Sequence, residues 1–206
     1  MGDTGSSIAH RVVNDRGTTA GTRHPQGASP YAFRCSATGC SRLPGIDQAG
    51  FYYVMALSES DAVAGHAYVA GAFRALLWTG DQVTALPGED ARVADNAHAV
   101  NRQGDVVGWL GDRGTHKAVL WRGGKAIDLG TSGPSEAIAV NDRGDVVDWD
   151  TADGGARAFL WREGTLTALP LPAGVRAKPV GLSNGGFAIG NSVGTPDSQA
   201  FRWTLP

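Results

Sequence analysis

Three carboxylates crowd one short stretch of the chain, DWDTAD, where Asp148, Asp150 and Asp153 surround Trp149. Repulsion between these charges beside an apolar ring would raise the pKa of at least one of them. A carboxyl group with a raised pKa can serve as a general acid. The same three residues could instead collect Ca²⁺, although the loop lacks the closing Glu of an EF-hand.

Asp148 also departs from a pattern that the chain repeats. The stretch AVNDRGDVVDWD (139–150) nearly repeats AVNRQGDVVGWL (99–110), which has glycine in that place. The other copies have glycine there as well, at Gly21, Gly65, Gly108 and Gly190. The position therefore favours a small residue or a special backbone angle. Breaks in a local rule are typical of functional sites, with drift as the alternative, so we take Asp148 and Asp150 as candidate catalytic residues.

Further candidates are scattered along the chain. His66 and Glu89 could share acid–base work with these aspartates. Aromatic rings such as those of Trp109 and Trp149 could stack on a sugar or a flat hydrocarbon ligand, or could simply pack between repeats. The full set of candidate ligand-binding residues is Trp109, Trp149, Tyr68, Arg92, His116 and Asn191.

Several classes of function are disfavoured. The sequence has no G-x-S-x-G, H-E-x-x-H or Walker motif and no Cys or His cluster with metal-ligand spacing, so we expect neither a metal nor a cofactor. The formal net charge is −2 and no run of Lys or Arg occurs, which disfavours nucleic acid as a partner. No stretch is long and apolar enough to insert into a membrane.

The two cysteines, Cys35 and Cys40, stand close together in CSATGC. If the residues between them form a hairpin loop, a disulfide can close and would indicate an oxidising compartment. Two reduced thiols in a cytoplasmic protein are the alternative. The first residues, MGDTGSSIAH, have neither the basic start nor the apolar middle of a signal peptide.

An internal repeat defines the architecture. Five copies are anchored at Asn14, Ser58, Asn101, Asn141 and Ser183, spaced 44, 43, 40 and 42 residues apart. A second landmark keeps this rhythm at Trp78, Trp121, Trp161 and Trp203, with Cys35 in the corresponding place of the first copy. The copies cover approximately 9–44, 54–87, 97–130, 137–170 and 179–206, which we interpret as one domain spanning 1–206.

Each copy is predicted to contain four short strands. In the third copy these are 97–101, 105–109, 117–121 and 125–129, with turn residues between the first two and between the last two. The third strand is apolar along its whole length in AVLW, AFLW and ALLW, so both of its faces should be covered. Units of about 42 residues with four strands are typical of a β-propeller. We therefore predict an all-β, five-bladed propeller whose four repeat tryptophans are core residues.

The pattern of alanine-rich strand, Asn, Gly turn, VVG and an aromatic strand resembles bacterial HAF-repeat proteins. The resemblance covers nearly all of 9–206 and is carried by AVNDRGDVV, RAFLW, YAFRC and QAFRW. The His of the family name is replaced by Tyr31, Arg74, Lys117, Arg157 and Gln199. Because that family is often extracellular and is defined by its repeat alone, the resemblance implies architecture and export but no reaction.

The last copy ends after its third strand, and no strand precedes the first copy to replace the fourth. The fifth blade should therefore lack its outer strand and expose 199–203 as an edge. We expect this edge to pair in a homodimer or to fray.

Within each copy, variable loops connect the second strand to the third and one copy to the next. Their rim is where a pocket is expected. The preferred function is binding of a small ligand there, either a glycan or an aromatic or hydrophobic metabolite. One alternative is an enzyme with an asymmetric Asp, Glu and His site for hydrolysis, elimination or cyclisation. A structural or protein-interaction propeller is the other alternative.

Overall fold

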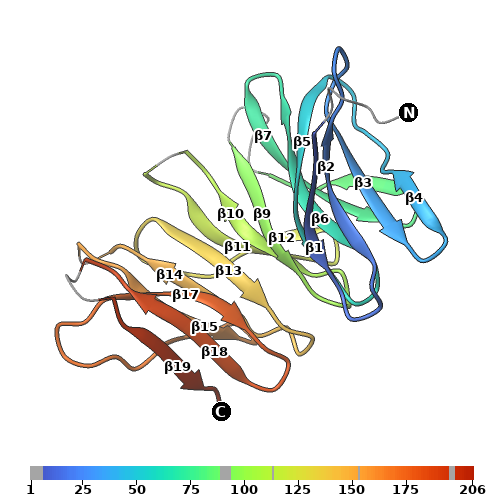
Figure 1. The fold of residues 1–206 in the computed structure, drawn as a ribbon. Coiled ribbons are helices and arrows are strands. Elements are labelled where there is room, and N and C mark those ends of the chain that lie inside the picture. The colour runs from blue at the N-terminus through green and yellow to red at the C-terminus, as the bar shows by residue number, and fades with distance from the viewer. Residues whose placement is uncertain (1–6, 89–93, 113, 153, 195–197) are drawn as a thin grey trace.

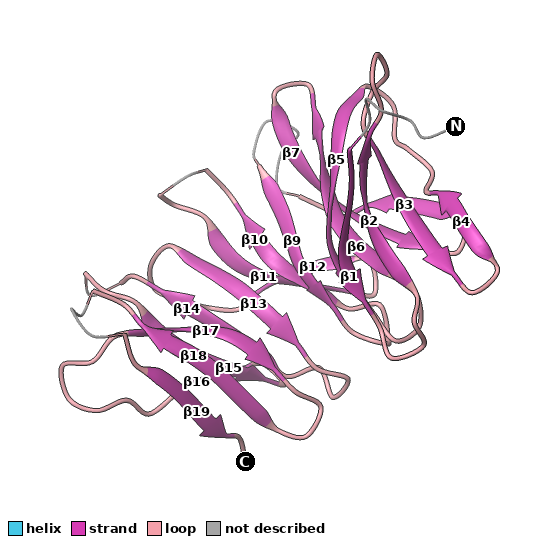
Figure 2. Ribbon diagram, in the orientation of Figure 1, coloured by secondary structure: helices cyan, strands magenta, loops and turns pink. Residues whose placement is uncertain are grey.

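A computed structural model describes residues 7–88, 94–112, 114–152, 154–194 and 198–206. These residues form five small antiparallel sheets joined by turns and loops, and no helix occurs among them (Figures 1 and 2). No helix that could cross a membrane is therefore found in the described parts of the chain. The prediction of an all-β fold is confirmed.

The sheets follow one another along the chain, and each corresponds to one sequence repeat. We call them blades 1 to 5. Blade 1 contains β1 (Ser7–Val13), β2 (Thr19–His24), β3 (Tyr31–Ser36) and β4 (Gly39–Arg42). Blade 2 contains β5 (Ala49–Leu57), β6 (Val63–Val69), β7 (Ala72–Thr79) and β8 (Gln82–Ala85). Blade 3 contains β9 (Asp95–Val100), β10 (Val106–Leu110), β11 (Lys117–Arg122) and β12 (Lys125–Asp128).

Blade 4 contains β13 (Ser135–Val140), β14 (Val146–Asp150), β15 (Arg157–Arg162) and β16 (Thr165–Ala168). In the described residues blade 5 contains three strands, β17 (Ala177–Leu182), β18 (Phe187–Ser192) and β19 (Ala200–Thr204). Within every blade the strands pair in chain order, so the last strand in sequence lies at the edge. The expected absence of a fourth strand in blade 5 holds for the described residues.

The blades are held together by apolar cores between sequence neighbours. Four such cores join blades 1 and 2, 2 and 3, 3 and 4, and 4 and 5. In the described residues no core joins blade 5 back to blade 1, and these two blades lie at opposite ends of the molecule in Figure 1. The structure is thus an arc of five sheets, and ring closure is not seen in it.

The repeat tryptophans are the centres of these cores. Trp78, Trp121, Trp161 and Trp203 are at most 5% exposed. The indole Nε1 of three of them donates to a proline carbonyl of the preceding blade, at Pro44, Pro87 and Pro170, over 2.8 Å each time. Blade 1 has no preceding blade among the described residues, and Cys35 replaces the tryptophan there.

The repeat anchors stabilise the turn between the first two strands of each blade. The Oδ1 of Asn101 accepts hydrogen bonds from the backbone amides of Gln103 and Asp105, at 3.1 and 2.9 Å. Its Nδ2 donates across the blade boundary to the carbonyl of Asn141, at 3.0 Å. One side chain therefore pairs with the backbone amides of a turn and links two blades. These two roles explain why the position recurs so regularly.

Replacing Asn101 separates these two roles. Asn101→Ala should lower the free energy of unfolding by about 2 kcal/mol, because it leaves the buried amide of Asp105 and the buried carbonyl of Asn141 unpaired. Asn101→Ser should cost about half as much, since Ser58 fills the equivalent place and its Oγ accepts from two turn amides at 3.2 and 3.1 Å. Urea titration of both variants tests this, and equal losses would contradict a separate contribution of the link to Asn141.

Candidate functional site

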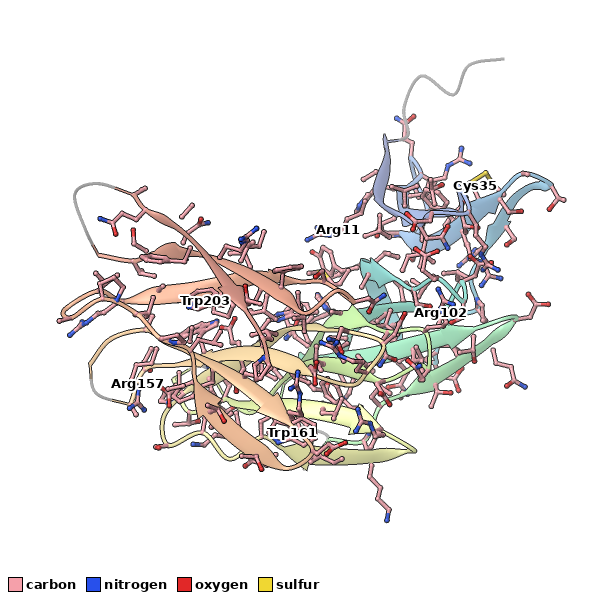
Figure 3. The ribbon with its side chains drawn as sticks, turned by 90° about the horizontal axis from the view of Figure 1, so that it is seen from below. Arg11, Cys35, Arg102, Arg157, Trp161 and Trp203 are labelled. Atoms are coloured by element: carbon pink, nitrogen blue, oxygen red, sulfur yellow. A yellow bond between two sulfur atoms is a disulfide. The ribbon has the colours of Figure 1, made fainter. Side chains whose placement is uncertain are left out.

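The first strand of every blade carries a bulge at an equivalent residue. The pairing register shifts around Arg11, Met55, Ile138 and Val180, and His98 lies in the same place on β9. A bulge leaves one residue unpaired and redirects its side chain. Arg11 reaches toward the middle of the arc (Figure 3). The first strands therefore display side chains that differ from blade to blade.

Glu136, on β13, is the centre of a polar cluster on these strands. Its Oε1 lies 3.3 Å from Nε2 of His116 in blade 3, without the alignment of a hydrogen bond. Burial lowers the pKa of His98 in blade 3 and of Lys178 in blade 5, and the negative charge of Glu136 opposes this lowering in both groups. The charge of one carboxylate therefore acts on basic groups in both neighbouring blades.

Trp109 lies at the edge of this cluster, on β10. Its ring centroid is 5.1 Å from that of His116, and its side chain is half-buried. The carbonyl of His116 accepts from the amide of Ser135, at 3.0 Å, which fixes the loop before β11 against the start of β13. We call Trp109, His116, Glu136 and Lys178 the inner cluster.

Trp149 is not available for stacking on a ligand. It is 7% exposed, and Nζ of Lys178 lies 3.1 Å from the centroid of its ring. A cation over an indole face is attracted to it, so Trp149 serves as the platform that positions Lys178. The two tryptophans that the sequence places in equivalent positions therefore have different surroundings.

Asp148 is fully buried and stands apart from the inner cluster. Neither carboxyl oxygen has a hydrogen-bond partner, and burial, followed by the charge of Asp150, raises the pKa of Asp148 to about 8. Asp148 lines none of the four main cavities among the described residues, and neither does any member of the inner cluster. The expected rise in the pKa of Asp148 is present.

The equivalent glycines explain why the position is small. A Cβ at Gly108 or Gly65 would run into a carbonyl oxygen of the first strand, Asn96 or Tyr53 respectively. Neither these glycines nor Asp148 has a positive φ, so close approach to the neighbouring backbone is the reason and a special backbone angle is not. Blade 4 contains the larger residue although its first strand has the same bulge, between Ala137 and Ala139.

Asp150 is engaged in a buried ion pair. Arg157 donates to it twice, from Nε at 3.0 Å and from Nη2 at 2.9 Å. Asp150 is wholly buried, whereas the Arg157 side chain is 38% exposed. This bidentate ion pair holds the start of β15 against the end of β14. The carboxylate of Asp150 therefore has a structural role and is not free.

The candidates of blade 2 form an aromatic cluster. His66 lies among Tyr53 and Phe73, with ring centroids 5.1 Å away in both cases. Burial, together with the charges of His98 and Arg11, lowers the pKa of His66 to about 4, so it is neutral at pH 7. Tyr68 stacks on Phe51, with centroids 5.1 Å apart, and its side chain is exposed.

The remaining candidates are placed as follows. Asn191 is exposed and pairs with Lys178 in the ladder between β17 and β18. Glu89, Arg92 and Asp153 lie outside the described residues. In the described parts of the chain no group of His, Cys, Asp or Glu has the geometry to hold a metal ion.

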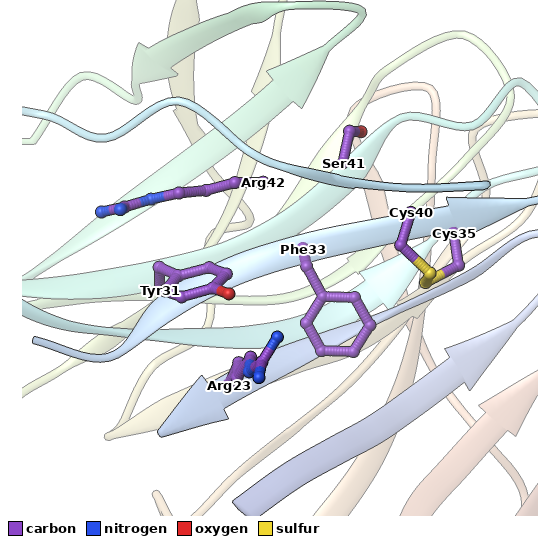
Figure 4. A pocket seen from close by; sticks show the side chains of 7 residues that line it. All are labelled: Arg23, Tyr31, Phe33, Cys35, Cys40, Ser41 and Arg42. Carbon is purple, nitrogen blue, oxygen red and sulfur yellow. A yellow bond between two sulfur atoms is a disulfide. The ribbon is translucent and has the colours of Figure 1, made fainter. Parts of the chain in front are cut away.

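A disulfide joins Cys35 and Cys40, which face each other across β3 and β4. Beside it lies a cavity of about 180 Å³ whose lining includes Tyr31, Phe33 and Arg42 (Figure 4). The guanidinium of Arg42 lies over the Tyr31 ring, 4.6 Å from its centroid. The sequence left the oxidation state open, and the structure has the bonded form.

Two members of the inner cluster, Glu136 and Lys178, escaped the sequence analysis. Both lie five residues before their repeat anchors, where the other copies have Ala9, Tyr53 and Asn96. This position differs in size or charge from copy to copy, which is the signal that would have identified the two residues. The sequence analysis places the site on the connecting loops, whereas these two residues lie on the first strands of their blades.

Sequence comparison finds no matching family model and no matching curated protein. Among solved structures, the chain is similar to selenomethionine-substituted virginiamycin B lyase from Staphylococcus aureus, with 16% identity and a TM-score of 0.49, covering 100% of this chain and 71% of that one. A mutant of the Aleuria aurantia lectin, in complex with alpha-methyl-L-fucoside, matches with 9% identity and a TM-score of 0.41, covering 98% and 75%.

Proposed function

We propose that this protein binds a small, sugar-like ligand at the inner cluster. The observation that carries the proposal is the 3.3 Å approach of Glu136 to His116 of blade 3, together with Lys178 of blade 5 held over the ring of Trp149, the strand partner of Glu136. Charged groups without a complete set of partners in a half-buried place are suited to receive a polar ligand. His116 belongs to the loop between β10 and β11, which is one of the variable connections where the sequence analysis expects a site.

The residue types of the inner cluster match the chemistry of a sugar. A carboxylate such as Glu136 accepts hydrogen bonds from hydroxyl groups, and an ammonium such as Lys178 donates to them. The ring of Trp109 offers an apolar face for the C–H side of a pyranose. Lys178 would also favour an acidic sugar over a neutral one.

Exchange of Glu136 tests this binding role. Glu136→Gln should weaken binding about tenfold or more, because a hydrogen bond to a charged group contributes about 1.5–3 kcal/mol. Isothermal titration against neutral monosaccharides and uronic acids provides the measurement. Glu163→Gln is the matched control, since Glu163 is exposed in the hairpin between β15 and β16. Equal affinities for wild type and both variants, or no binding by wild type, would refute the proposal.

A second candidate is an acid–base enzyme acting on the same kind of ligand. The 3.3 Å approach of His116 Nε2 to Glu136 Oε1 favours it, because an imidazole beside a carboxylate can move a proton in hydrolysis, elimination or cyclisation. Product formation from a bound sugar, lost in His116→Asn while affinity is kept, would support catalysis. Binding without any product would leave the ligand-binding module as the function.

We also propose an extracytoplasmic location and a relationship to the HAF-repeat proteins. The disulfide between Cys35 and Cys40 supports the location, since such bonds persist in oxidising compartments. The four-stranded units support the relationship.

A further inference from the structure

Blade 2 extends further toward the rim with variable loops than blade 3 does. β5 and β6 contain nine and seven residues, whereas the equivalent strands β9 and β10 contain six and five. With the repeat spacing of 43 residues, the additional residues are 49–51 and 68–69, at the strand ends opposite the turn between β5 and β6. Phe51 pairs there with Tyr68, and Tyr68 pairs with Phe73 of β7. The added length therefore carries a row of aromatic side chains.

We call Phe51, Tyr53, Tyr68 and Phe73 the aromatic cluster. The rings of Phe51 and Tyr68 are parallel, with centroids 5.1 Å apart, and Phe73 makes a T-shaped contact with Tyr68 at 5.4 Å. Tyr53 makes T-shaped contacts with Phe51 and Phe73, at 5.5 and 6.3 Å. These contacts orient the rings, yet Tyr53 and Tyr68 are 40% and 36% exposed. The aromatic cluster is therefore a preorganised surface that remains open to solvent.

His66 is buried against the aromatic cluster and adds no charge to it. Its ring contacts those of Tyr53 and Phe73, with centroids 5.1 Å away in both cases. Burial, together with the charges of His98 and Arg11, lowers the pKa of His66 to about 4, so the imidazole is neutral at pH 7. An uncharged aromatic surface is suited to the C–H face of a sugar ring.

The aromatic cluster continues the inner cluster along the same rim. β5, β9 and β13 lie against one another in that order (Figure 1). Phe73 of blade 2 and His116 of blade 3 occupy the same repeat position, so they lie at equivalent places on adjacent blades. The charge of Glu136 acts on His98, and the charge of His98 acts in turn on His66. A ligand at the inner cluster can therefore reach the aromatic cluster by extending across blade 3.

We propose that the ligand is an oligosaccharide and that the aromatic cluster binds a second sugar residue of it. The C–H face of this residue packs on the exposed parts of Tyr53 and Tyr68, and their hydroxyl groups exchange hydrogen bonds with its own. This inference rests on the sugar-binding function proposed above, because the first residue occupies the inner cluster. It adds the size of the ligand, which is a chain and not a monosaccharide.

A proline-rich peptide is a poorer occupant of the aromatic cluster. Extended proline-rich segments also dock on aromatic surfaces. Such a segment would use the aromatic rings alone, whereas the surface continues into Glu136 and Lys178, whose charges match hydroxyl and carboxylate groups. An oligosaccharide uses both parts of the surface.

The direct test compares sugars of increasing chain length. Isothermal titration of the intact protein uses galacturonic acid, digalacturonic acid and trigalacturonic acid, with glucose, cellobiose and cellotriose as the neutral series. In the series that binds more tightly, wild type should bind the trimer about tenfold or more tightly than the monomer, because the second contact is made at a high effective concentration. We call this ratio the chain-length gain.

Four variants assign the chain-length gain to the aromatic cluster. Tyr68→Ala should remove the gain, and Tyr53→Ala should do so while leaving the stack of Phe51 and Tyr68 in place. Phe187→Ala is the matched control, because Phe187 is 42% exposed but lies at the start of β18, beside the turn on the opposite rim. It should keep the full gain. Glu136→Gln should weaken the monomer and the trimer by the same factor.

Three outcomes would overturn this inference alone. One is equal affinity of wild type for monomer and trimer, which would leave the sugar site at the inner cluster intact. Another is a gain that persists in both tyrosine variants, because the second residue would then bind elsewhere. The third is binding of acetyl-hexaproline-amide, lost in Tyr68→Ala, without any gain for the sugars, which would assign the aromatic cluster to a proline-rich partner. No binding of any sugar would refute the sugar-binding function together with this inference.

Discussion

Asp148→Gly is expected to raise the free energy of unfolding at pH 8 by about 2 kcal/mol or more and to remove much of its pH dependence. Asp148 is wholly buried, and both of its carboxyl oxygens lack a hydrogen-bond partner. A buried polar group without partners costs about 1–3 kcal/mol. Glycine occupies this position in the other four repeats, so the fold accepts it, at a backbone cost of about 1 kcal/mol.

The sign of the pH effect follows from the raised pKa. Burial lifts the pKa of Asp148 from 3.8 to about 8, so the folded protein keeps a proton that the unfolded chain releases near pH 4. Between these values the unfolded state binds fewer protons, and stability falls as the pH rises. At about 1.4 kcal/mol per pH unit the upper limit of this loss is about 6 kcal/mol. Below pH 4 both states are protonated, and above pH 8 both are ionised.

Urea unfolding of wild type and Asp148→Gly from pH 4 to pH 9 provides the measurement. The difference between the two proteins should be small at pH 4 and should grow toward pH 8. Taking the difference removes the contributions of Asp95, whose pKa burial raises to about 6, and of His66. Asp81→Gly, in an exposed hairpin turn, is the control for replacing an aspartate by glycine. A constant difference at every pH would show that Asp148 does not titrate in this window.

The same variant decides between two views of Asp148. The sequence identifies it as an exception among five equivalent residues, and in the structure its carboxyl oxygens are buried without a hydrogen-bond partner among the described residues. If Asp148→Gly has a higher free energy of unfolding and an unchanged sugar affinity, the aspartate destabilises the fold and has no role in binding. A loss of sugar affinity would connect it to the inner cluster, through the shared strand pair β13 and β14.

The sequence predicted the repeated unit well because its signals are local and recur. Asn101 and its equivalents cap a turn within a few residues, and Trp121 and its equivalents alternate with residues of the opposite face. Such patterns depend on the strand period and on turn chemistry, which need no knowledge of distant contacts. The strand order within blades and the three-stranded last sheet followed from them.

The candidate site was predicted less well because it depends on how blades meet. His116, Glu136 and Lys178 lie about 20 and 42 residues apart in sequence, and only the packing of blades 3, 4 and 5 brings their charges together. The sequence DWDTAD suggests that Asp150 is a free carboxylate. In the folded protein, however, Arg157 pairs with it across β14 and β15. Ring closure likewise depends on the small rotation between successive sheets, which repeats in sequence do not specify.

The arc also predicts that loss of one internal tryptophan should split the unfolding transition. Trp121→Ala removes the centre of the core between blades 2 and 3, together with the indole hydrogen bond to Pro87. Truncation of a buried tryptophan costs about 3–5 kcal/mol. Because the apolar cores of the described residues join only sequence neighbours, stability is approximately a sum of blade and boundary contributions. Weakening an internal boundary should therefore let blades 1–2 and blades 3–5 unfold separately.

Trp203→Ala is the matched comparison, since Trp203 occupies the same place at the boundary between blades 4 and 5. Its loss should free only β17–β19, so that calorimetry retains the main transition while hydrogen exchange accelerates in the last blade. For Trp121→Ala calorimetry should resolve two transitions, with exchange accelerated on both sides of the boundary. A closed ring would behave differently, because contacts between blades 5 and 1 would keep the two parts together after one boundary is weakened. A single, equally lowered transition in both variants would therefore contradict the arc.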